Sequence, residues 1–213
     1  MSTTGLRALL LLGSAALAGC GQEGAAPGTA AREAAVTGSV TKGPLQGATV
    51  SFFRIDAVTG SPTTFVTSAV TDASGNFVVT SLPAGELILA KTSGGSYVDE
   101  SDPDTSASRR QITFGAGEFL EALLPAGATS IAITPYSMAL YKKALVQANG
   151  GNFANVYAAV MVQAEAAFGF DPILTLPANP ITGAGGDAQY AILLGAAAQA
   201  INAIAVSAGH LPG

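Results

Sequence analysis

The sequence is poor in the residues that most enzymes use for catalysis or for binding metals. Its 213 residues include one cysteine, Cys20, one histidine, His210, and no tryptophan. A single cysteine excludes a disulfide within the chain. A Ser-His-Asp arrangement needs a histidine held against a nucleophile, and His210 stands near the end of the sequence, where chains are usually mobile. We therefore expect no catalytic residue, no histidine or cysteine metal site and no cofactor, and we predict that the protein is not an enzyme.

Charged residues are also scarce. They make up 11% of the chain, and the formal net charge is -5. Binding to a phosphate backbone needs clustered lysine and arginine, so nucleic acid is not an expected partner. Hydrophobic residues make up 49% of the chain, which is enough to bury a core.

The first residues have the layout of a secretory signal peptide. Arg7 supplies a positive charge, and a short apolar run ends in Leu17-Ala18-Gly19-Cys20. This run is too short for a stable transmembrane helix. The last four residues resemble the lipobox of bacterial lipoproteins, in which the cysteine is lipidated with acyl chains such as palmitate and becomes the new N-terminus. The resemblance implies a signal peptide over residues 1–19, export, and a membrane as partner through lipid on Cys20. Because Gly21 follows, it also implies the outer membrane or the cell surface.

Short strands separated by turn residues fill the next part of the chain. Residues 20–35 contain the lipidated cysteine and a spacer rich in glycine and alanine, which we expect to be flexible. Residues 36–133 predict seven or eight strands with no helical period between them. We expect them at residues 36–40, 48–55, 63–71, 76–82, 86–91, 110–114, 120–124 and 130–133. This pattern is typical of an antiparallel β-sandwich.

Three motifs in this part carry a family resemblance. They are Val36-Thr37-Gly38-Ser39-Val40, the turn and strand at residues 43–50, and Thr71-Asp72-Ala73-Ser74-Gly75-Asn76-Phe77. In this order they resemble the opening strands and turn of carboxypeptidase-regulatory-like domains, which are transthyretin-like or Cna-B-like β-sandwiches. The resemblance implies a stalk, spacer or adhesive module without catalysis.

After Thr134 the period becomes helical, and residues 134–213 predict a unit of three helices. Thr134 is the expected cap of the first helix, with Pro135 at its first position. Asn152 is expected to cap a second helix that Gly169 ends, and a third is expected over residues 187–207. The predicted fold class is therefore α+β, with an N-terminal antiparallel β-sandwich followed by a small three-helix unit.

Two further expectations concern these helices. The second helix has a bulky stripe, which we expect to pack on the sandwich so that both parts form one cooperative body: Phe153, Tyr157, Val160 and Phe168. Residues 190–207 are long and apolar enough to suggest a membrane span. Gln199 and Asn202 interrupt this segment, however, and no lysine or arginine flanks it. We expect a buried bundle helix instead.

One acidic segment, residues 99–104, offers candidate calcium ligands. Asp99, Glu100, Asp102 and Asp104 place four carboxylates within six residues, and Ca²⁺ takes six to eight oxygen ligands. Their spacing does not match an EF-hand loop, so we expect a solvated turn. Asp72, Ser74 and Asn76 alternate in a similar way, but Gly75 between them favours a hairpin turn.

These observations favour a membrane-anchored lipoprotein of the cell envelope that acts as a non-catalytic structural, adhesive or binding module. Its expected partner beyond the membrane is an envelope protein or a polysaccharide. The alternative is a periplasmic or outer-membrane enzyme, or a calcium-dependent carbohydrate-binding protein, that uses the loop 99–104. A solute-binding lipoprotein normally needs two α/β lobes around a cleft, and the sequence has no βαβ alternation.

Overall fold

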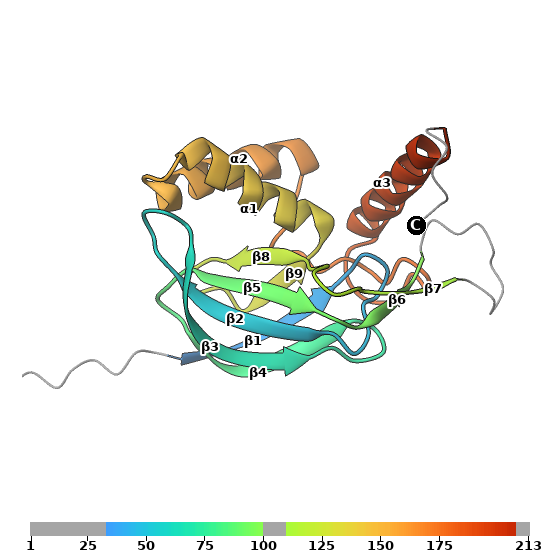
Figure 1. The fold of residues 1–213 in the computed structure, drawn as a ribbon, viewed down its shortest axis with the longest axis horizontal. Helices are drawn as coiled ribbons and strands as arrows, with labels where there is room; N and C mark the ends of the chain where they lie inside the picture. The colour runs from blue at the N-terminus through green and yellow to red at the C-terminus, as the bar shows by residue number, and fades with distance from the viewer. Residues whose placement is uncertain (1–32, 100–109, 208–213) are drawn as a thin grey trace, which may run out of the picture. The chain divides into compact units, whose positions relative to one another are not determined.

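The computed structural model describes residues 33–99 and 110–207, which form nine strands and three helices (Figure 1). The predicted α+β class is confirmed, with strands in the N-terminal part and helices in the C-terminal part. The strands are β1 (Glu33–Val40), β2 (Thr49–Ile55), β3 (Pro62–Val70), β4 (Asn76–Pro83), β5 (Ile88–Ser93), β6 (Ser96–Val98), β7 (Gln111–Thr113), β8 (Glu121–Leu124) and β9 (Ser130–Ile133). The helices are α1 (Pro135–Ala148), α2 (Phe153–Phe168) and α3 (Ala188–Ser207).

Two sheets make the sandwich, one with the order β4-β1-β9 and the other with the order β3-β2-β5-β8. In β2, Val50 and Phe52 are buried while the residues between them are partly exposed, as expected for a strand with one face on the core. Phe52 meets Phe77 of β4 with 5.9 Å between ring centroids, so side chains of the two sheets meet in the core. A separate pair, β6 and β7, flanks residues 100–109.

The expectation of a wholly antiparallel sandwich is wrong for one strand pair. β1 and β9 run parallel, from Thr37 opposite Ser130 to Val40 opposite Ile133. Parallel neighbours need a long connection, and the many residues between these two strands provide it. The alternation of buried and exposed side chains is the same for both strand directions, so the sequence pattern does not reveal this pairing.

The ends of the first two helices are set by different means. Thr134 caps α1 as predicted, because its side chain accepts a hydrogen bond from the Ser137 amide and the Ser137 hydroxyl accepts one from the Thr134 amide. Asn152 occupies the predicted N-cap position of α2, but its side chain makes no capping hydrogen bond. The loop between β2 and β3 replaces it. The amides of Phe153 and Ala154 donate to the carbonyls of Val58 and Ala57 at 2.9 and 3.0 Å.

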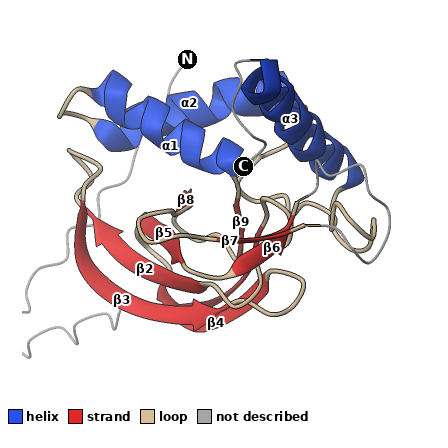
Figure 2. Cartoon of the chain, turned by 45° about the vertical axis from the view of Figure 1, so that its right-hand side comes forward, coloured by secondary structure: helices blue, strands red, loops and turns tan. Residues whose placement is uncertain are grey.

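The helices lie on one side of the strands, and α1 and α2 cover the edge of the four-stranded sheet (Figure 2). β8 is that edge, and its outward carbonyls would otherwise have no strand to pair with. The Ser137 hydroxyl of α1 donates to the Glu121 carbonyl at 3.3 Å, and the Tyr157 hydroxyl of α2 donates to the Leu123 carbonyl at 3.0 Å. Two side chains thus take the place of a further strand, which protects the edge from unwanted pairing.

The core runs without a break from the strands into α1 and α2. Phe153, Tyr157 and Val160 are buried in the same cluster as the sheet residues, as expected from the stripe on α2, and Phe168 is half-buried against Tyr136. Tyr141 of α1 extends this contact, because its hydroxyl donates to the Gly60 carbonyl at 2.8 Å.

The third helix is buried only near its start, so the expectation of a buried bundle helix is wrong for its second half. Tyr190 and Leu194 pack on Ala132 of β9, and the Tyr190 hydroxyl lies 2.8 Å from Thr134 Oγ1. Further along, Ile201 and Ile204 are 65% and 68% exposed. The cause is that the small alanine and glycine side chains after Leu194 offer little surface for packing. No helix within the described residues is long and apolar enough to cross a membrane.

Candidate functional site

The structure reaches only part of the predicted calcium loop. Asp99 is buried, and its carboxylate accepts a hydrogen bond from Arg110 at 3.2 Å. Glu100, Asp102 and Asp104 lie outside the described residues, as does Cys20. Within residues 33–99 and 110–207, no group of three histidine, cysteine, aspartate or glutamate side chains is placed to hold a metal. The solvated turn and the lipidation of Cys20 therefore stay predictions.

The second acidic motif is a tight turn, but the expected hairpin is wrong, because the turn joins β3 of the four-stranded sheet to β4 of the three-stranded sheet. Asp72 Oδ1 accepts hydrogen bonds from the amides of Ser74 and Asn76, both at 2.8 Å, and Gly75 has a φ of 78°. This oxygen is thus used by the backbone of its own turn.

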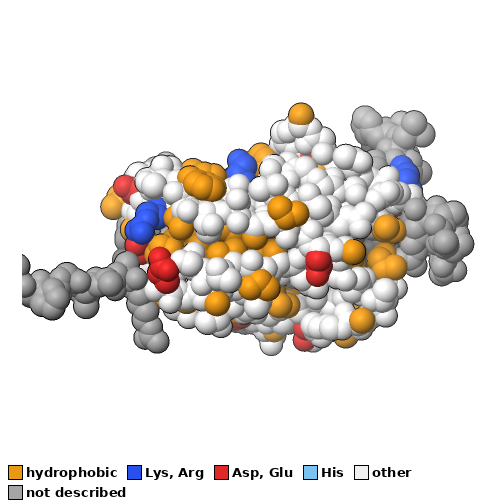
Figure 3. All heavy atoms as spheres, turned by 90° about the horizontal axis from the view of Figure 1, so that it is seen from below, with side chains coloured by type: hydrophobic (Ala, Val, Ile, Leu, Met, Phe, Trp, Pro, Cys, Tyr) orange, Lys and Arg blue, Asp and Glu red, His pale blue; other side chains and the backbone are white. Residues whose placement is uncertain are grey.

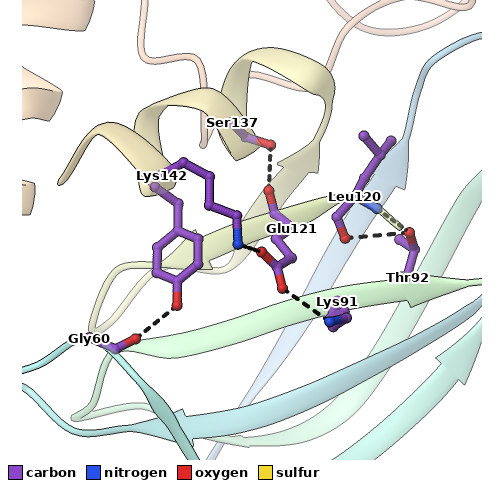
Figure 4. Close-up of polar contacts among 8 residues, drawn as sticks. Gly60, Lys91, Thr92, Leu120, Glu121, Ser137 and Lys142 are labelled. Atoms are coloured by element: carbon purple, nitrogen blue, oxygen red, sulfur yellow. Dashed lines mark hydrogen bonds and ion pairs between the residues drawn. The ribbon is translucent and has the colours of Figure 1, made fainter. Parts of the chain in front are cut away.

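A buried carboxylate on β8 forms the main ionic cluster of the described chain (Figure 4). Glu121 contacts Lys142 of α1 and lies 3.4 Å from the Lys91 ammonium of β5. The Lys91 ammonium also sits 3.8 Å from the centroid of the Phe119 ring, a cation–π contact. Each oxygen of Glu121 faces a lysine, so the cluster joins the sheet to α1.

A polar groove lies where one end of the sandwich meets the loop before α3. It consists of two adjoining cavities of about 270 and 180 Å³, which we call the Ser39 cavity and the Tyr97 cavity. Both are lined by Pro44, Asn179 and Thr182. The Ser39 cavity is also lined by Ser39, Thr41, Ser74, Asn76, Leu176, Pro177, Ala184, Gly185 and Gly186, and the Tyr97 cavity by Gln46, Ala73, Tyr97, Val98 and Ile181.

The strand side of the Ser39 cavity comes from the three-stranded sheet. Ser39 lies opposite Asn76 of β4, so the two side chains are neighbours across the strands. Ser39 is only 3% exposed, and its Oγ has no hydrogen-bond partner among the residues that the structure describes. Several other buried hydroxyls are paired. For example, the Thr71 hydroxyl donates to the Leu45 carbonyl at 2.6 Å.

The loop side is held in place by its own turns. Asn179 Oδ1 accepts hydrogen bonds from the amides of Ile181 and Thr182 at 2.8 and 3.1 Å. Gly186 has a φ of 54°, and a Cβ at this position would lie 2.4 Å from the Pro177 backbone. Only glycine allows the loop to fold back so closely.

Among the described residues, no charged side chain lines either cavity. The lining supplies hydroxyl and amide groups, which can both donate and accept hydrogen bonds, together with the ring of Tyr97. Lys42 is the neighbouring cation, with its ammonium 5.5 Å from the centroid of that ring. The surface in Figure 3 likewise shows few charged side chains among neutral ones. Such a lining can orient a neutral polar ligand through hydrogen bonds.

The sequence analysis did not find this groove. Its residues come from separate segments around residues 39–46, 73–76, 97–98 and 176–186, and the hydroxyl, amide and glycine residues among them resemble those of any turn. The one signal in the sequence was the cluster Gly183-Ala184-Gly185-Gly186 beside three prolines, in a segment assigned only as a loop.

Comparison with known proteins assigns no family. No family model and no curated protein matches the chain. Among solved structures, it is similar to a "putative carbohydrate binding protein" from Pseudomonas aeruginosa, with 14% identity and a TM-score of 0.29 over 48% of this chain and 88% of that chain. This similarity is too low to support an argument about function. The carboxypeptidase-regulatory-like resemblance stays a prediction.

Proposed function

We propose that this protein is a lipoprotein of the cell envelope, anchored through lipid on Cys20, whose folded body is a non-catalytic binding module. The observation that supports it is the uncharged, hydrogen-bonding groove. Its two cavities together fall within the range of about 300–1,000 Å³ that is usual for small-molecule sites.

The anchor is tested first. Mass spectrometry of the mature protein should find a diacylated or triacylated Cys20 at the N-terminus, and the protein should fractionate with the outer membrane. Cys20→Ser should release nearly all of it into the soluble fraction, because that residue carries the acyl chains. Cys20→Ala is the matched control and should behave in the same way. An unmodified wild-type chain that begins elsewhere would contradict the anchor.

Binding is tested with the lipidated mature protein in a detergent that has no sugar headgroup. Co-sedimentation with insoluble envelope polysaccharide should remove the protein from solution in a saturable manner. A parallel reaction with soluble fragments of the same polysaccharide should compete. If the protein stays in solution with every polysaccharide preparation and also captures no small polar ligand, the binding module is refuted even where the lipid anchor is present.

A further inference from the structure

We infer that the Ser39 cavity is the subsite for an uncharged, hydroxyl-bearing group of the ligand, the chemistry of a neutral saccharide, and that Ser39 is the residue that recognises it. This inference rests on the proposed function, because it names the ligand class of the same groove.

The first argument is the state of the Ser39 hydroxyl. A buried hydroxyl without a partner lowers the stability of the folded chain, and the buried hydroxyls of Thr92, Thr134 and Ser137 all make hydrogen bonds. Ser39 is buried to the same degree but has none. An unpaired buried polar group that lines a cavity is explained when its partner arrives with a ligand.

The second argument is the chemistry of the surrounding groups. Asn76 lies opposite Ser39 across the strands, and Asn179 and Thr182 line the cavity from the loop. Amide and hydroxyl groups on both sides match the hydroxyls of a sugar, each of which donates and accepts. A carboxylate or phosphate would enter a cavity that no lysine or arginine of residues 33–99 and 110–207 lines, and its lost hydration would not be compensated by a cation there. The neutral ligand is therefore the one that the lining favours.

An ordered water is the competing partner for Ser39. The cavity of about 270 Å³ is far larger than the roughly 30 Å³ of one water molecule, so it has room for several waters or for a group of a ligand. A sugar hydroxyl in this position can make the hydrogen bonds that a water would make there.

Calorimetry on the lipidated mature protein, again in a detergent without a sugar headgroup, tests the inference. The probes are the neutral cellohexaose, maltohexaose and N-acetylglucosamine hexamer, and the anionic hexagalacturonate. At least one neutral probe should bind, and hexagalacturonate should bind more weakly. Ser39→Ala should weaken the neutral probe about three- to tenfold, since one hydrogen bond is lost. Ser39→Ala should also raise the Tm of the free protein by about 2–4 °C, because it removes an unpaired buried hydroxyl.

Two further variants make the result decisive. Ser68→Ala, on the exposed part of β3, is the matched control and should change neither quantity. Asn76→Ala keeps the backbone hydrogen bond of its turn and should weaken the neutral probe to a similar extent. If the protein binds a neutral probe but Ser39→Ala and Asn76→Ala bind it equally well, the subsite is refuted while the binding module stands. Tighter binding of hexagalacturonate would also overturn the inference. If no saccharide binds to the wild-type protein, whereas another polar ligand does, the ligand class is wrong.

Discussion

Replacing Phe153 by alanine should lower the free energy of unfolding by about 3–5 kcal/mol, the usual cost of removing a fully buried phenylalanine. Phe153 is 0% exposed, and its ring stacks on Tyr157 and meets Tyr141 edge-on, with centroids 5.9 and 5.8 Å apart. A Cβ on Gly60 would lie 2.5 Å from the same ring, so this residue is packed from both the helices and the β2–β3 loop. Urea unfolding followed by circular dichroism measures the loss.

The same experiment tests whether sheet and helices unfold together. Because the core is continuous through Phe153, the variant should unfold in one transition at a lower urea concentration, with an unchanged dependence on urea. Val162→Ala is the control, since Val162 lies on the same helix but is 68% exposed. It should change stability by less than about 0.5 kcal/mol. Two separate transitions in Phe153→Ala, with the helices lost first, would show that the two parts are independent domains.

Local signals explain why much of the fold could be predicted. In β2, buried and partly exposed side chains alternate because successive residues of a strand point to opposite faces. Thr134 and Pro135 set the start of α1 within a single turn. Asn149 and Gly169 end α1 and α2 in left-handed conformations, which asparagine and glycine adopt most easily. For these elements the short-range sequence contains the physical cause.

The predictions that failed depend on distant partners. Asn152 has the right residue type for a cap, but the carbonyls of the β2–β3 loop already take the first amides of α2. β9 runs parallel to β1, a strand far from it in the sequence, so the residues of β9 alone do not reveal its direction. The same reason hid the candidate site. Ser39 reads as one residue of an ordinary strand, and its burial becomes visible only when the loop 176–186 is folded over it.

Raising the pH above about 10 should destabilise the protein steeply, because the pKa values of three buried tyrosines are raised in the folded chain. The pKa of Tyr141 is raised to about 12, mainly by burial and to a smaller extent by the charge of Glu121. The pKa of Tyr157 is also raised, mainly by burial and to a smaller extent by the charge of Asp171. Burial also raises the pKa of Tyr190, although its hydrogen bond with Thr134 acts in the opposite direction. Unfolded tyrosine has a pKa of about 10.

The direction of the effect follows from proton binding in the two states. Above about pH 10 the unfolded chain releases phenolic protons that the folded chain keeps, so stability is complete below that pH and is lost as the pH rises further. Each of the three groups contributes about 1.4 kcal/mol per pH unit, or about 4 kcal/mol together. Urea unfolding by circular dichroism between about pH 8 and about pH 11.5 measures this slope. Tyr157→Phe should remove about one third of this slope. The variant also loses the hydrogen bond to the Leu123 carbonyl, but that loss changes the stability at every pH and not the slope. A stability that is flat up to pH 11.5 would mean that the three hydroxyls ionise without leaving their buried sites, which would contradict the raised pKa values.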